Sequence, residues 1–215
     1  MIVLAVLAPI AAYLIGSISF AVIFTKVFSK TDVREHGSGN AGTTNVLRVA
    51  GKTAGILTFL CDALKGAAAA LLGMLVFKAV FGSDADMLIM YGKYICGIAC
   101  MVGHAFPIWF GFKGGKCAAT SVGIFAVCCP LAIVAGLIGY AVNMLVTRIV
   151  SLSTLIATVL VVGFSIGING FDGIANPDIA IIILSLLGGI IVFWRHKDNI
   201  KRLIKGEEKK LKIKK

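Results

Sequence analysis

The chain has 215 residues, of which 59% are hydrophobic and 14% are charged, and its formal net charge is +11. Soluble domains average about 45–50% apolar and about 25% charged residues. The composition therefore excludes a disordered chain, a disulfide-rich secreted domain and an ordinary soluble enzyme. It predicts a polytopic membrane protein whose basic excess lies in cytoplasmic loops, rather than a partner of nucleic acid.

Several apolar segments approach or exceed the ~20 residues that a membrane-spanning helix needs. The first has no basic region before it, so we expect a retained span and not a cleaved signal peptide. The fourth is too long for one span and contains Pro130, which predicts either one kinked helix or two short helices. The segments cover residues 2–24, 54–81, 88–106, 118–146, 152–169 and 178–194.

Charge favours a turn at Pro130. With that turn there are seven spans, 18 of the 21 Lys and Arg residues share one face, and the connections 82–86 and 170–177 on the other face carry only acidic charges. We therefore predict a single all-α domain over 1–215 with seven transmembrane helices, the N-terminus outside and a basic cytoplasmic tail over 195–215. The run EEKKLKIKK (207–215) should be solvated or touch lipid headgroups.

The same layout gathers four donor-rich segments on the cytoplasmic face. Glycines let backbone N–H groups converge on an anion, while hydroxyls, amides and fixed cations add further donors. Four such segments predict binding of more than one phosphate group, or of a phosphate and a second polar substrate. The segments are GSGNAGTTNVLR (37–48), GHAFPIWFGFKGGK (103–116), TRIVSLS (147–153) and RHKDN (195–199).

Two motifs in these segments imitate nucleotide sites. Gly37–Gly42 matches G-x-G-x-x-G, but a dinucleotide site needs a preceding strand, and here the motif lies between two membrane spans. Lys113–Lys116 resembles part of a P-loop, but Phe110 stands where the first glycine is required and Cys117 replaces Ser or Thr. Neither match predicts a nucleotide cofactor.

Individual residues have a functional and a structural interpretation. Arg48 is favoured as a phosphate clamp over an interfacial anchor, and His104 is equally consistent with a base, a phosphate ligand or a structural histidine. Asp62 and Lys65 can pair on one helix or serve the active site, since charges in a span are costly. The other expected substrate-binding residues are Gly37, Gly39, Asn40, Gly42, Thr44, Asn45, Lys113, Gly114, Gly115, Arg148 and Ser151.

In order and spacing, the segments 37–48, 103–120 and 147–153 resemble the three motifs of the bacterial acyl-phosphate:glycerol-3-phosphate acyltransferase family. The resemblance implies an enzyme of the bacterial plasma membrane with seven helices and its active site facing the cytoplasm. Its reaction transfers a fatty acyl group from acyl phosphate to the 1-hydroxyl of sn-glycerol 3-phosphate, giving lysophosphatidate and phosphate. It implies no metal and no cofactor, membrane lipids as surroundings, and no obligate protein partner.

By this resemblance the main catalytic residues are Ser38, Arg48, Lys116, His196 and Asn199. The sequence departs from the family at Cys117, where Gly is common, and at Ile149, where Tyr is frequent. No histidine is followed by an aspartate in an H-x-x-x-x-D pattern, so acyl-CoA enzymes of that type are excluded. A membrane transporter for a phosphorylated metabolite is the alternative, although its polar groups should lie near the midplane of the membrane.

Overall fold

The computed structural model describes residues 1–171 and 179–211, with the backbone alone for 169–171. All regular secondary structure in these ranges is helical, and the chain forms two compact units, Met1–Cys128 (unit 1) and Cys129–Lys215 (unit 2). Of the predicted features, most of the connection 170–177 and the last four residues lie outside the described ranges.

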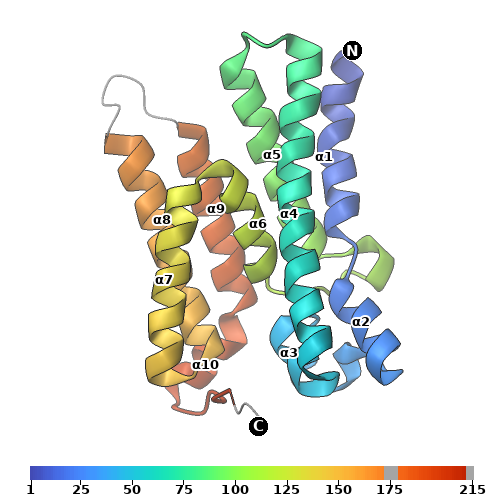
Figure 1. Cartoon of the computed structure of the whole chain (residues 1–215), viewed down its shortest axis with the longest axis vertical. Coiled ribbons are helices and arrows are strands. Elements are labelled where there is room, and N and C mark those ends of the chain that lie inside the picture. The colour runs from blue at the N-terminus through green and yellow to red at the C-terminus, as the bar shows by residue number, and fades with distance from the viewer. Residues whose placement is uncertain (172–178, 212–215) are drawn as a thin grey trace. The chain divides into compact units, whose positions relative to one another are not determined.

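Unit 1 is a helical bundle with two polar loops at one end (Figure 1). The long α4 packs against α1, α5 and α6, while the short α2 and α3 pack against its first turns. The elements are α1 (Ile2–Gly16), α2 (Phe20–Ser29), η1 (Val33–Glu35), α3 (Thr43–Val49), α4 (Gly51–Phe81), α5 (Asp86–Ala105), η2 (Ile108–Phe110) and α6 (Ala118–Cys128).

Glycines bring the helices of unit 1 into close contact. A Cβ at Gly66 would overlap the backbone of Thr120, and one at Gly123 would overlap the backbone of Ala63, so α4 and α6 touch through their main chains. Gly73 of α4 faces Gly92 of α5 in the same way. Small residues suit such contacts in a membrane, where van der Waals packing rather than exclusion of water drives association.

Unit 2 consists of α7 (Pro130–Thr147), α8 (Val150–Phe171), α9 (Ile179–Arg195) and α10 (Lys197–Ile204). Helix α8 packs against both α7 and α9, and α10 follows α9 after a bend of 62°. Residues after α10 fold back, because the N–H of Leu211 donates to the carbonyl of Arg148 at 2.7 Å. The expectation that the run from Glu207 is solvated or touches lipid headgroups is therefore wrong for Glu208 and Leu211, since Glu208 also bonds to this unit.

Among the residues that the structure describes, five helical stretches are long and apolar enough to span a membrane, and a sixth is obtained if α9 and α10 count as one bent span, so the seven predicted spans are not all found. The predicted break at Pro130 is confirmed, because α6 ends at Cys128 and α7 begins at Pro130. Proline suits the first position of a helix, because a backbone N–H there would have no partner within the helix. Helix α6 has only 11 residues, about 16 Å of rise, against a hydrocarbon core of ~30 Å. Its first residue, Ala118, is also the first residue of the predicted apolar segment 118–146.

Candidate functional site

The loop that precedes α3 is built around the side chain of Asn45. Its Oδ1 accepts the N–H of Ser38 at 2.9 Å, and its Nδ2 donates to the carbonyls of Val33 and His36, each at 2.9 Å. Asn45 is buried with an exposed fraction of 2%. Gly37 has φ +65°, and a Cβ there would overlap Asn45 Oδ1, which explains why glycine stands at that position. Both Nδ2 protons of Asn45 are therefore engaged in hydrogen bonds that hold the loop.

This scaffold leaves other predicted donors unengaged. The hydroxyl of Ser38 and the guanidinium of Arg48 make no hydrogen bond or ion pair with the described residues, and both residues are exposed. Arg48 lies in the last turn of α3. Asn40, Gly42 and Thr44 lie between them and are half-buried. The loop therefore presents a hydroxyl and a cation on a fixed backbone, the combination that binds a phosphate.

The second polar segment meets this loop at Gly115. The N–H of Gly115 donates to the carbonyl of His104 at 3.1 Å. A Cβ on Gly115 would overlap His104 Nε2 and lie 2.6 Å from the carbonyl oxygen of Ala41, and a Cβ on Gly114 would overlap the His104 carbonyl. The prediction that segments 37–48 and 103–116 come together is confirmed by these contacts. Lys113 is exposed and Lys116 half-buried beside them.

Arg34 forms a second connection between the two segments. Its guanidinium donates to the carbonyl of Phe110 at 2.8 Å and lies 5.7 Å from the centre of that ring. The same group donates to Asp32, with Nε 3.0 Å from Oδ1 and Nη2 2.7 Å from Oδ2. The hydrogen bonds from Arg34 hold the pKa of Asp32 below its usual value. Asp32, Arg34 and Phe110 thus form a latch, hereafter the Arg34 latch, from η1 to η2.

Three ionisable side chains are buried behind these loops. Lys65 Nζ lies 2.7 Å from Asp62 Oδ1 and donates to the carbonyl of Ile18 at 2.6 Å. His104 Nδ1 lies 3.6 Å from the same carboxylate oxygen, and the exposed fractions of all three residues are at most 7%. The predicted Asp62–Lys65 pair is confirmed. His104 lies between this pair and Gly115, so the buried charges support the imidazole next to the polar loops.

In unit 2 the carboxylate of Glu208 accepts hydrogen bonds from two of the predicted donors, Ser151 and Asn199. Glu208 Oε1 accepts from the Ser151 hydroxyl at 2.8 Å and from Asn199 Nδ2 at 2.6 Å, and Oε2 accepts from Arg202 Nε at 2.6 Å. Burial alone would raise the pKa of Glu208, but these three hydrogen bonds outweigh it and hold the pKa below its usual value. His196 is buried and its Nδ1 donates to the Val192 carbonyl at 2.8 Å, whereas Arg148 is exposed.

The sequence interpretation missed the Arg34 latch and Glu208. Arg34 donates to a carbonyl 76 residues away, and no local sequence pattern predicts such a contact. The acid–base pair Asp32 and Arg34, two residues apart just before a glycine-rich loop, is the one local signal of a role in holding that loop. Glu208 stands in a charged run that is typical of solvated tails. Among residues 1–171 and 179–211, no three His, Cys, Asp or Glu side chains lie close enough to hold a metal ion.

Comparisons with known proteins agree on one family. Residues 6–206 match the family described as glycerol-3-phosphate acyltransferase. A glycerol-3-phosphate acyltransferase of Anaeromyxobacter dehalogenans (strain 2CP-1 / ATCC BAA-258) is 41% identical over 201 residues, which is 94% of each chain. Glycerol-3-phosphate acyltransferase 2 of Bacillus anthracis is 37% identical over 206 residues, covering 96% of this chain and 98% of its own.

A solved structure is similar over nearly the whole chain. It is a crystal structure of PlsY (YgiH), an integral membrane glycerol 3-phosphate acyltransferase, in its glycerol 3-phosphate form. The sequence identity is 32%, the TM-score is 0.81, and the match covers 97% of this chain and 96% of that chain.

Proposed function

The chain belongs to the glycerol-3-phosphate acyltransferase family, and from this premise we propose that it transfers a fatty acyl group from acyl phosphate to the 1-hydroxyl of sn-glycerol 3-phosphate. The products are lysophosphatidate and inorganic phosphate, at the start of phospholipid synthesis. The transporter alternative has no support from the relatives, which are named as acyltransferases.

The observation that carries this assignment is the convergence of two polar segments at Gly115, with Ser38 and Arg48 left unengaged. Ser38, Arg48 and Lys116 bind phosphate, with Lys113 as a further cation. Asn45 holds the loop, and Asp62 and Lys65 support His104. The backbone around Gly37, Gly39, Gly42, Gly114 and Gly115 allows close approach of an anion.

From unit 2, His196, Asn199, Ser151 and Arg148 are proposed as further contacts to the substrates. Ser151 and Asn199 already donate to Glu208, so we expect them to exchange or share that partner when an anionic substrate binds. These roles are tested separately from those of unit 1, by variants of His196 and Asn199.

The proposed chemistry is direct acyl transfer. The glycerol hydroxyl oxygen attacks the acyl carbonyl, a new C–O ester bond forms, and the bond from the acyl carbon to the phosphate oxygen breaks. Phosphate leaves with the electron pair, and the hydroxyl proton goes to phosphate oxygen, His104 or His196. The protein's contribution is to hold two mutually repelling anions in contact, and positioning of this kind is worth up to about 7–11 kcal/mol in ideal intramolecular reactions.

The proposed topology has seven membrane crossings, with the N-terminus outside and the polar loops in the cytoplasm of a bacterium. Its support is the charge distribution, since the loop 25–53 and the tail 195–215 are basic. The chain is then a multi-pass protein of the plasma membrane. Impermeant labelling of cysteines introduced at exposed Lys30 and Gly82 tests it, because the two positions should lie on opposite faces.

The donor is tested with purified protein in nanodiscs, labelled glycerol 3-phosphate, and acyl phosphate, acyl-CoA and acyl carrier protein in parallel. We expect labelled lysophosphatidate with acyl phosphate alone. A rate with acyl-CoA that equals or exceeds the rate with acyl phosphate would overturn the donor assignment.

The site is tested by Ser38→Ala and Arg48→Ala, each expected to lower kcat/KM by about 10²–10³, as for loss of one preorganised donor. Lys52→Ala is the matched control, because Lys52 is an exposed cation four residues after Arg48. Full activity of a well-folded Arg48→Ala variant would contradict the assignment.

A further inference from the structure

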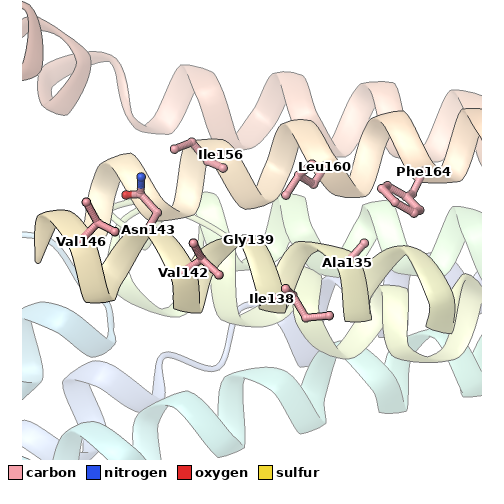
Figure 2. Close-up of a pocket in the computed structure, with 9 residues that line it drawn as sticks. All are labelled: Ala135, Ile138, Gly139, Val142, Asn143, Val146, Ile156, Leu160 and Phe164. Atoms are coloured by element: carbon pink, nitrogen blue, oxygen red, sulfur yellow. The ribbon is translucent and has the colours of Figure 1, made fainter.

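Polar side chains bond across a break between two helices in each unit. In unit 2, Asn143 accepts hydrogen bonds from the Thr147 and Ser153 hydroxyls at 3.0 and 2.9 Å. It is the one polar residue among the nine that line an apolar surface between α7 and α8 (Figure 2). Those bonds stay within this pair of helices. In unit 1, by contrast, the end of α1 bonds to the second polar segment, 103–116.

One face of α1, at its end, carries these bonds. Tyr13 and Ser17 lie four positions apart, one turn of helix. The Tyr13 hydroxyl donates to the carbonyl of Phe106 at 2.8 Å. The Ser17 hydroxyl donates to the Tyr13 carbonyl at 2.9 Å, and its oxygen accepts the N–H of Ile108 at 3.4 Å. Two side chains therefore reach backbone groups that lie 93 and 91 positions later in the chain.

The end of α1 is itself fixed. A Cβ on Gly103 would overlap the carbonyl oxygen of Tyr13, so α1 and α5 touch there through their main chains. Just after α1, the buried Lys65 of α4 donates from Nζ to the Ile18 carbonyl at 2.6 Å. The two hydroxyls thus extend from a helix end that two neighbouring helices hold in place.

The stretch 108–112, which these hydroxyls reach, is held only weakly by its own side chains. The exposed fractions are 45% for Ile108, 62% for Trp109 and 56% for Phe112, whereas Phe110 packs on a buried cluster of unit 1. Apolar side chains that face lipid gain little from contact with the protein. Backbone hydrogen bonds must therefore hold this stretch. Its neighbouring backbone groups at 106, 108 and 110 bond to Tyr13, Ser17 and Arg34.

The same stretch continues directly into the turn 114–116. The N–H of Phe112 donates to the carbonyl of Pro107 at 2.9 Å, which closes the chain on itself. A Cβ on Gly114 would lie 2.6 Å from Pro107 Cδ and would overlap the carbonyl of His104. Because the turn packs on residues next to the two anchored backbone groups, a displacement of those groups displaces the turn.

We infer that Tyr13 and Ser17 are positioning residues for the proposed reaction. Through the stretch 106–112 they set the place of the turn 114–116, and with it the place of Lys116, which binds substrate phosphate in the proposed function. The inference rests on that function. Both residues act through the loop and not on the substrate itself, so their removal should weaken binding of glycerol 3-phosphate more than it slows the chemical step.

Tyr13→Phe and Ser17→Ala each remove one hydroxyl and little else. A neutral hydrogen bond is worth about two- to tenfold in an equilibrium constant. We therefore expect Tyr13→Phe to raise the KM for glycerol 3-phosphate about fivefold, and Ser17→Ala, whose bond to the loop is longer, about threefold. The value of kcat should change by less than about twofold, the pattern expected when binding is lost equally in the ground and transition states.

Each variant has a matched control. Tyr91→Phe removes a tyrosine hydroxyl from an exposed position on α5. Ser185→Ala removes a buried serine hydroxyl that donates to the Ile182 carbonyl within its own helix. Both controls should keep the wild-type KM for glycerol 3-phosphate.

A double-mutant cycle with Lys116→Ala separates positioning from a general loss of packing. Because Tyr13 and Ser17 act through Lys116, their substitutions should raise KM by less than about 1.5-fold further when Lys116 is already alanine. A general loss of packing would raise KM by the same factor in both backgrounds.

The outcomes distinguish this inference from the proposed function. If the wild type transfers no acyl group from acyl phosphate to glycerol 3-phosphate, the proposed function fails. If the wild type is active but both variants keep its KM, the inference is overturned. It is also overturned if KM rises equally with and without Lys116, or if kcat falls while KM stays unchanged.

Discussion

The donor-rich regions of the two units differ in what their donors already bind. In the loop 33–48, Asn45 holds the backbone while the Ser38 hydroxyl and the Arg48 guanidinium have no partner among the described residues. In unit 2, Ser151 and Asn199 both donate to Glu208. The first region is a supported loop with open donors, and the second is a closed hydrogen-bonded cluster.

The difference separates residues that hold the site from residues that bind in it. The chain has 10 acidic residues against 21 basic ones, and two of these acids, Asp32 and Glu208, each fix a neighbouring arginine and a polar segment. Cations that are not fixed in this way, Arg48 above all, are left for anionic substrates. Each prediction below removes one contact that holds the site, and the measurement shows whether stability or substrate binding depends on that contact.

The largest effect is expected from Asn45→Ala. The change leaves the Val33 and His36 carbonyls and the Ser38 N–H without their partner. Of these residues Val33 is buried, and an unsatisfied buried group costs about 1–3 kcal/mol. We expect a loss of about 2–5 kcal/mol in unfolding free energy and a fall in activity of more than 100-fold. Denaturation and rate measurements in one detergent check this, with Thr53→Ala, an exposed position on α4, as control. A wild-type rate in Asn45→Ala would show that the loop is not held by this side chain.

Arg34→Lys should come next. Lysine keeps the charge but loses the planar fork that reaches Asp32 and the Phe110 carbonyl together. We expect the KM for glycerol 3-phosphate to rise about tenfold, equivalent to about 1.4 kcal/mol, with kcat less affected, because the two loops must be brought together on binding. Glu35→Gln, at an exposed neighbour, is the control. An unchanged KM would show that the Arg34 latch does not support binding of glycerol 3-phosphate.

Glu208 makes the closed cluster sensitive to pH. Its pKa is lower in the folded protein than the ordinary value of 4.5, so the folded state binds fewer protons than the unfolded one. Its stabilising contribution is therefore complete above that value and is lost as pH falls through the lowered pKa. The protection of amides 205–211, measured as their exchange relative to the intrinsic rate at each pH, should fall at low pH in the wild type and should be low at all pH values in Glu208→Gln. Equal protection in both proteins at neutral pH would contradict the cluster.

The smallest effect is expected at Cys117. This buried residue has φ 64°, a conformation that favours glycine, and its Sγ donates to the Met101 carbonyl at 3.2 Å. Cys117→Gly relieves the backbone but loses the thiol and gains unfolded-chain entropy, so we expect a stability change within about 1 kcal/mol. Cys117→Ala keeps the strained φ and loses the same bond, so it should be less stable than Cys117→Gly. The reverse order would show that the backbone is not strained there.

Local patterns predicted what local physics determines. The all-helical character, the break at Pro130 and the Asp62–Lys65 pair follow from composition, proline chemistry and helical spacing, and the structure agrees with each. Of the seven predicted spans, five or six are found among the described residues. Asn45 was expected to bind substrate, yet its amide protons go to the loop backbone. That role depends on how the chain curls back from Val33, which a list of donors does not reveal.

The features that the sequence did not predict depend on contacts between residues far apart in the chain. The bond from Arg34 to Phe110 and the bond from Glu208 to Ser151 join residues 76 and 57 positions apart, and neither belongs to a periodic pattern. Gly114 and Gly115 pack on His104 ahead of helix α6, which begins at Ala118. Sequence patterns located the polar segments, and tertiary packing decided which of their residues stay free.

Direct binding of labelled glycerol 3-phosphate tests the central claim, that the open donors of the 37–48 loop grip this substrate. Equilibrium dialysis with the protein in nanodiscs would compare the wild type, Arg48→Ala and Lys52→Ala. We expect saturable binding by the wild type and by Lys52→Ala, and an affinity at least about tenfold weaker for Arg48→Ala, because a charge-assisted hydrogen bond is lost. Equal affinity in wild type and Arg48→Ala would contradict it.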